Sequence, residues 1–117
     1  ISSFQNTQFK LALLASELFA SRLVIRSNAR RFDAETNDSE LNLKCVPLPS
    51  VIAAGKLITT EKAFTIIDQC LQLFGGYGYL KDFPLQQLLR DTRVHRILEG
   101  TNEIMQLIIS RDFVQQK

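Results

Sequence analysis

The stretch SVIAAGKLITTEKAFTIIDQCLQLFGG, residues 50–76, decides the fold class of this chain. Its apolar side chains recur at the spacing of an α-helix and give that helix a wide apolar face. The residues of this face are Ile52, Leu57, Ile58, Ala63, Phe64, Ile67, Leu71 and Phe74. Gly75 and Gly76 follow and are typical of a C-terminal cap. We therefore predict a long amphipathic helix from about Ser50 to Phe74.

The rest of the chain carries similar patterns. Apolar residues at helical spacing predict a helix over residues 4–31, and a polar, acidic segment that ends in two prolines predicts an exposed connection over residues 32–49. A short helix over residues 85–92 and a last helix over residues 102–115, with Thr101 as its N-cap, complete the pattern. Because the alternation typical of strands is missing, the sequence predicts an all-α fold, an up-down four-helix bundle.

Composition excludes several classes of protein. With 117 residues, 45% hydrophobic and 22% charged, the chain has the size and make-up of one globular domain rather than of a disordered or fibrous protein. The net charge of +2 is small, and basic residues are interleaved with acidic ones, which disfavours nucleic acid as a partner. No apolar run reaches the roughly eighteen residues that a membrane span needs.

Few residues could form a metal or disulfide site. His95 is the single histidine, so we predict no metal centre. Cys45 and Cys70 are predicted to be reduced and structural. The chain opens with Ile1, inside a helical pattern and without a signal peptide, so we expect it to be a piece of a longer protein.

Glu99 is the acidic residue whose surroundings suggest chemistry. It follows Ile97 and Leu98 and precedes Gly100 at a predicted break between helices. A carboxylate beside apolar side chains is partly desolvated, which suits a general base. A carboxylate just before a helix is also a favourable partner for the helix dipole, and the residues alone leave both interpretations open.

Three further motifs, taken together, indicate a family. QLFGGYGYLKDFP (residues 72–84), LLRDTR (88–93) and ILEGTNEIMQLIISR (97–111), with the opening helix FQNTQFKLALLASELFASRLVIR (4–26), closely resemble the C-terminal helical domain of the acyl-CoA dehydrogenases. The resemblance covers essentially the whole chain. Gln87 stands where many members have a basic residue, and Leu98 stands where many have tyrosine. The isobutyryl-type branch of the family shares both features, so the chain resembles that branch most.

The resemblance implies an activity and a role for Glu99. It implies FAD-dependent α,β-dehydrogenation of a short branched acyl-CoA thioester, in which Glu99 removes the α-proton and the β-hydrogen leaves as hydride to the flavin. The thioester oxygen would be held by the backbone N–H of Glu99 and by a hydroxyl of the flavin side chain. Gly100 would let the thioester approach the backbone, and Arg111 would contact the CoA ester.

The resemblance also implies where FAD is bound. Two segments match family positions that touch the cofactor, the first of them from a neighbouring subunit. They are Gln72, Leu73, Phe74, Gly75 and Gly76, and then Thr101, Asn102 and Glu103. Exposed backbone N–H groups after a helix, or at the start of one, suit an anion. Without the resemblance, a plain helix cap would explain the first segment.

Further expectations concern the whole protein. The resemblance implies a homotetramer, electron-transfer flavoprotein as the electron acceptor, and valine breakdown in the mitochondrial matrix. The 117 residues alone, without an N-terminal helical domain and a middle β-domain, are expected to be inactive. Two alternatives stay open: a non-catalytic helical oligomerisation module, and an acyl-CoA oxidase.

Overall fold

The computed structural model describes residues 1–36 and 46–114. In this part of the chain every regular element is helical, which confirms the predicted all-α class. The elements are α1 (Gln5–Thr36), α2 (Leu48–Phe74), the 3₁₀-helix η1 (Gly75–Tyr79), α3 (Leu85–His95) and α4 (Asn102–Val114).

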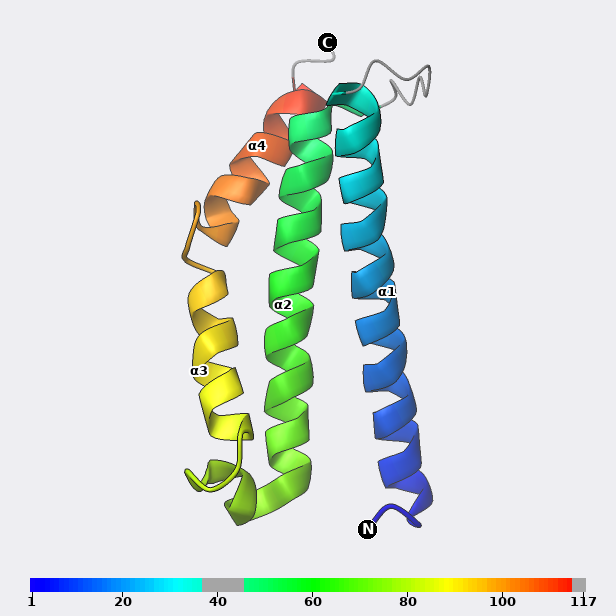
Figure 1. Cartoon of the computed structure of the whole chain (residues 1–117), viewed down its shortest axis with the longest axis vertical. Coiled ribbons are helices and arrows are strands. Elements are labelled where there is room, and N and C mark those ends of the chain that lie inside the picture. The colour runs from blue at the N-terminus through cyan, green and yellow to red at the C-terminus, as the bar shows by residue number, and fades with distance from the viewer. Residues whose placement is uncertain (37–45, 115–117) are drawn as a thin grey trace.

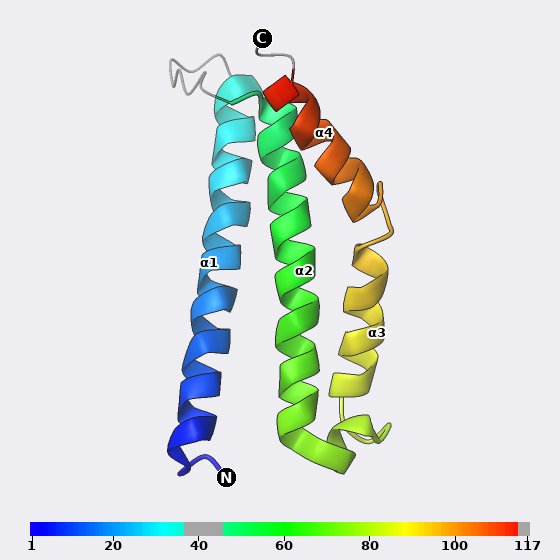
Figure 2. The same ribbon diagram turned by 180° about the vertical axis from the view of Figure 1, so that it is seen from behind.

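Helix α2 is the centre of the fold. It packs against α1 on one side and against α3 and α4 on the other, whereas α1 meets neither α3 nor α4 within the described residues. Figures 1 and 2 show α2 running antiparallel to α1, with α3 and α4 following one another in one direction beside it. The bundle measures 50 × 29 × 27 Å and has three columns, in which α3 and α4 share one column.

Three helices extend beyond a predicted boundary. Helix α1 continues past Arg31, where an ion pair of 2.9 Å between Arg31 and Glu35 supports its last turn. Helix α2 already begins at Leu48, because Pro49 lies in the first turn, where a missing N–H costs no hydrogen bond. Helix α3 runs to His95 rather than Thr92. The predicted end of the last helix at residue 115, and residues 37–45 of the connection with Cys45, lie outside the described residues.

The hydrophobic core of the fold is small. Among the described residues only three hydrophobic side chains are buried, namely Leu14, Ala53 and Met105. Large apolar side chains of α1 stay exposed instead, including Phe9 at 64% and Phe19 at 65%. Large exposed apolar side chains of this kind are typical of a contact surface when they lie side by side. None of the described helices is long and apolar enough to cross a membrane.

A hydrogen bond and an ion pair join α1 to α2. The Asn28 amide donates a hydrogen bond of 2.8 Å to the carbonyl oxygen of Val51. Nearer the N-terminus, the Lys62 ammonium lies 2.7 Å from the Glu17 carboxylate. Cys70, on α2, is a free thiol as predicted.

The predicted glycine cap of α2 is confirmed. Gly75 has a φ of 61° and donates its N–H to the carbonyl oxygen of Gln72. The chain then tightens into η1, where Gly78 is buried against the end of α2. A Cβ at Gly78 would lie 2.9 Å from the Cβ of Phe74 and 3.0 Å from the backbone oxygen of Leu71. This position therefore excludes any side chain.

Gly76 and Gly78, both in η1, provide a matched test. We expect Gly78→Ala to lower the free energy of unfolding by about 1–3 kcal/mol, because the new methyl group meets backbone that cannot move aside. Gly76→Ala should change it by less than about 0.5 kcal/mol, because a Cβ at Gly76 meets nothing within 4 Å. Urea denaturation followed by circular dichroism measures both. Equal effects of the two substitutions would contradict the described packing.

Candidate active site

The turn between α3 and α4, residues 96–101, carries Glu99. Two backbone hydrogen bonds from Ile97 and Leu98 to the oxygen of Val94 end α3, and the N–H of Asn102 closes the turn on the oxygen of Arg96 at 3.0 Å. Inside this loop Glu99 has a φ of 55°, a conformation that costs a side-chain-bearing residue about 1 kcal/mol. Strain of this kind persists only where surrounding contacts impose it.

Gly100 follows directly, with a φ of 93°. A Cβ at this position would lie 2.9 Å from the Cε of Met105, which is buried at the start of α4. The positive φ is the feature that favours glycine here, because the Cε of Met105 is the end of a flexible side chain and can move aside.

The Glu99 side chain is exposed. The sequence predicted that Ile97 and Leu98 would partly desolvate it, and within this chain that prediction is wrong, because both are themselves about half exposed, at 52% and 48%. The physical reason is that few elements pack around the turn. Only α2 and η1 contact α3, only α2 contacts α4, and no other described element covers the turn.

A polar cluster on α2 holds the end of the turn. Asn102 is only 4% exposed, and its side-chain oxygen accepts a hydrogen bond of 2.7 Å from the Lys56 ammonium. Its side-chain nitrogen donates to the Glu61 carboxylate at 2.7 Å and to the Thr60 hydroxyl at 3.0 Å. A cation can only donate and a carboxylate only accept, so these neighbours fix the orientation of the amide. We call Lys56, Thr60, Glu61 and Asn102 the Asn102 cluster.

Further contacts tie the turn itself to α2. The Lys56 ammonium also donates to the carbonyl oxygen of Gly100 at 2.9 Å, one residue from Glu99. At the other end of the turn, the Arg96 guanidinium lies 2.8 Å from the Glu61 carboxylate and sits 5.4 Å from the centre of the Phe64 ring. Both ends of the turn are therefore fastened to the same helix.

Sequence reasoning missed the Asn102 cluster. It assigned Asn102 to a cofactor-contacting turn, whereas the structure directs the amide inward and uses its oxygen and nitrogen within the chain. The available signal was a group of polar residues, Lys56, Thr60 and Glu61, within one and a half turns of the predicted amphipathic helix.

The neighbours of Asn102 behave differently. Thr101 caps α4 as predicted, because its hydroxyl oxygen accepts the N–H of Ile104 at 3.4 Å. Glu103 is exposed, and hydrogen bonds from its own backbone N–H and from the Thr101 hydroxyl hold the pKa of its carboxyl below the usual value. Smaller contributions come from the nearby cations of Arg96 and Arg93.

The turn presents unused hydrogen-bond donors. Among the contacts of the described residues, the backbone N–H groups of Glu99, Gly100 and Thr101 donate to no acceptor. Free N–H groups beside a helix N-terminus can hold an anion or a polarised carbonyl oxygen. The turn thus combines an exposed carboxylate with donors on the adjacent backbone.

The other predicted cofactor segment lies elsewhere. Residues 72–76 form the end of α2 and the start of η1, and the whole of α3, about 16 Å long, separates them from the turn of Glu99 (Figure 1). Gln72, Phe74, Gly75 and Gly76 are exposed and Leu73 is partly so. One chain therefore does not bring the two segments together. Arg111 is exposed in the last turn of α4, remote from Glu99.

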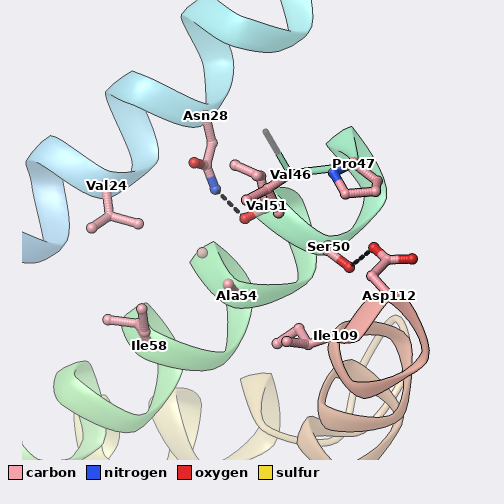
Figure 3. A pocket seen from close by; sticks show the side chains of 11 residues that line it. Val24, Asn28, Val46, Pro47, Ser50, Val51, Ala54, Ile58, Ile109 and Asp112 are labelled. Atoms are coloured by element: carbon pink, nitrogen blue, oxygen red, sulfur yellow. Dashed lines mark hydrogen bonds between the residues drawn. The ribbon is translucent and has the colours of Figure 1, made fainter. Parts of the chain in front are cut away.

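A separate pocket of about 300 Å³ is lined by residues of α1, α2 and α4, and Figure 3 shows this lining. Its polar side chains are already used within the chain. The Asn28 amide is bonded to Val51, and the Ser50 hydroxyl donates to the Asp112 carboxylate. The described residues also contain no group of three or more side chains that could hold a metal ion. The turn of Glu99 is therefore the better candidate for chemistry.

Comparison with known proteins identifies the family. Residues 1–113 match the family model described as acyl-CoA dehydrogenase, C-terminal domain. The chain belongs to the acyl-CoA dehydrogenase family.

Two relatives carry the name that the sequence predicted. The chain is 46% identical over 112 residues to the mitochondrial isobutyryl-CoA dehydrogenase of Dictyostelium discoideum, which covers 96% of this chain and 25% of that protein. It is 43% identical over 116 residues to the bovine enzyme of the same name, covering 99% and 26%. The predicted likeness to the isobutyryl-type branch is confirmed. The chain spans about a quarter of the length of these relatives.

Solved structures confirm the fold of this acyl-CoA dehydrogenase domain. Butyryl-CoA dehydrogenase from Megasphaera elsdenii superimposes with a TM-score of 0.82 at 26% identity, over 97% of this chain and 27% of that one. A chain from work on the electron transferring flavoprotein of Acidaminococcus fermentans gives 0.83 at 28% identity, over 98% and 28%.

The strained conformation of Glu99 leads to a stability prediction. We expect Glu99→Gly to have a free energy of unfolding about 1 kcal/mol higher than Glu99→Ala, because glycine adopts a positive φ without strain whereas alanine keeps the Cβ. Urea denaturation of the two variants, compared with each other, measures the difference. A more stable alanine variant would show that the turn relaxes when the carboxylate is removed.

The lowered pKa of Glu103 predicts a pH dependence. Because the folded state holds this pKa below its unfolded value, the carboxylate stabilises the fold at neutral pH. That contribution is lost as the pH falls below the ordinary carboxyl range and through the lowered pKa. Glu103→Gln should therefore be less stable than the parent near pH 7 and should differ less from it near pH 3. Unfolding curves at both pH values test this, and a constant difference would contradict it.

Proposed function

We propose that this chain is the C-terminal helical domain of an FAD-dependent acyl-CoA dehydrogenase that acts on a short branched acyl-CoA thioester such as isobutyryl-CoA. The observation that carries the proposal is the turn of residues 96–101, which pairs the Glu99 carboxylate with free backbone donors. Its residues match the family motif, and relatives named isobutyryl-CoA dehydrogenase are 43% and 46% identical.

In this proposal Glu99 is the general base. Its carboxylate takes the α-proton of the thioester, and the negative charge that develops moves to the thioester oxygen. The backbone N–H of Glu99, which has no acceptor among the described residues, donates to that oxygen. A fixed donor aimed at developing charge lowers the barrier more than a mobile water does. Bound FAD supplies the acceptor for the β-hydride.

The described residues fit a flavin dinucleotide in part. A Cβ built at Gly75 or Gly76 meets nothing within 4 Å, so a phosphate could approach this backbone freely. At the second segment the Thr101 hydroxyl already caps α4 and bonds Glu103, which leaves the backbone N–H groups as its donors. We therefore assign residues 72–76 to the cofactor through backbone, and Gly100 and Arg111 to the thioester and CoA.

The exposure of Glu99 requires a cover. A base that abstracts a weakly acidic C–H proton works best away from water. We propose that the part of the protein corresponding to the other three quarters of its relatives completes the niche over the turn. The exposed apolar side chains of α1 would be covered by the same regions and by other subunits of a homotetramer.

The cellular setting follows from the relatives. The Dictyostelium and bovine enzymes are both named as mitochondrial, so we propose the mitochondrial matrix and a role in valine breakdown. Electron-transfer flavoprotein is the proposed electron acceptor. The likeness to a chain from work on such a flavoprotein supports this proposal. An acyl-CoA oxidase would instead pass its electrons to oxygen, and a peroxide assay distinguishes the two.

The proposal predicts the behaviour of Glu99→Gln in the full-length protein. Glutamine keeps the size of the side chain but cannot accept the proton, so we expect kcat to fall on the order of 10²- to 10⁴-fold. Flavin content and thermal stability should stay at the parent level. Bleaching of the yellow flavin by isobutyryl-CoA, followed by stopped-flow absorbance, measures the loss. Near-normal bleaching in this variant would remove Glu99 from the role of base.

A further inference from the structure

We infer that Lys56 is a positioning residue for Glu99, acting through the Asn102 cluster. This inference rests on the proposed function, because it assumes that Glu99 is the base. Lys56 lies on α2, 44 residues before Gly100 in the sequence, and contacts both the turn and the start of α4. Its ammonium donates to the Gly100 oxygen at 2.9 Å and to the Asn102 side-chain oxygen at 2.7 Å.

The first contact acts on the residue next to the base. Because the peptide unit is planar, a bond to the carbonyl oxygen of Gly100 fixes the plane that joins Gly100 to Thr101. The backbone at Glu99 is held at a φ of 55°, which relaxes if the turn is released. Lys56 therefore restrains both the direction of the Glu99 side chain and that of its N–H.

The second contact makes the restraint rigid. Asn102 is bonded to Lys56 on its oxygen side and to Glu61 on its nitrogen side, at 2.7 Å each. Hydrogen bonds to charged partners are stronger than neutral ones, and Asn102 is 4% exposed, so water cannot easily replace them. Arg96 adds a bond of 2.8 Å to the same Glu61 carboxylate from the other end of the turn.

The number of independent restraints matters for catalysis. A base must be held close to its productive geometry, and a displacement of about 1 Å can cost on the order of 100-fold in rate. The Glu99 side chain has no partner among the described residues that could position it directly. Its orientation therefore depends on the backbone of the turn, and the turn depends on Lys56.

The test is Lys56→Met in the full-length, flavin-loaded protein, which removes the donors and keeps most of the side-chain stem. We expect the single-turnover rate of flavin bleaching at saturating isobutyryl-CoA, per bound flavin, to fall on the order of 100-fold. The dissociation constant of a non-reactive thioether analogue of the substrate should change less than about threefold, since the loss is in positioning rather than in binding.

Lys62→Met is the matched control. Lys62 lies on the same helix, and its ammonium bonds Glu17 on α1 at 2.7 Å, away from the turn. This variant should keep the parent rate. Thr60→Val is a milder change to the Asn102 cluster, with little change in volume, and should lower the rate severalfold. It serves as the test if Lys56→Met does not fold. Because the rate is counted per bound flavin, a mere loss of folded protein would not lower it.

A double variant separates this inference from the proposed function. If Lys56 acts through Glu99, adding Lys56→Met to Glu99→Gln should change the residual rate less than about twofold. A full additional loss in the double variant, or a parent rate in both Lys56→Met and Thr60→Val, overturns the inference while Glu99 keeps its role. Near-normal turnover of Glu99→Gln overturns the proposed function and the inference with it.

Discussion

The buried amide of Asn102, held between the Lys56 cation and the Glu61 carboxylate, is the constraint on which the candidate site depends. It joins the start of α4 to the middle of α2, and the additional bond from Lys56 to Gly100 brings the preceding turn with it. Without these contacts little would hold Glu99 at a positive φ, because no other described helix packs over the turn. Buried polar groups of this kind stabilise one arrangement only when every partner is satisfied.

The arrangement of the helices around α2 explains why the Glu99 side chain is exposed. With α2 in the middle and α1 on one side, α3 and α4 have a neighbour on one face only. The carboxylate of Glu99 is therefore presented outward, together with free backbone donors. The apolar side chains of α1 stay exposed for a similar reason, since α1 packs against α2 only. The proposed enzyme would close these surfaces with its remaining regions and with other subunits.

Periodicity was sufficient for the helices but not for their ends or their arrangement. The extension of α1 depends on the local pair of Arg31 and Glu35, and the early start of α2 depends on a proline that the first turn tolerates. Both rules are local, yet they compete with equally local signals for a loop. The shared column of α3 and α4 depends on which face of α2 each helix covers, and periodicity does not specify that.

The sequence by itself determined the all-helical class, the glycine cap at Gly75, the Thr101 cap and the family, because each depends on neighbouring residues or on contiguous motifs. Only the tertiary structure decided that Glu99 is exposed and that Asn102 points inward. The physical reason is distance along the chain: Lys56 and Asn102 are 46 residues apart, and no local pattern encodes the packing that brings their side chains to 2.7 Å.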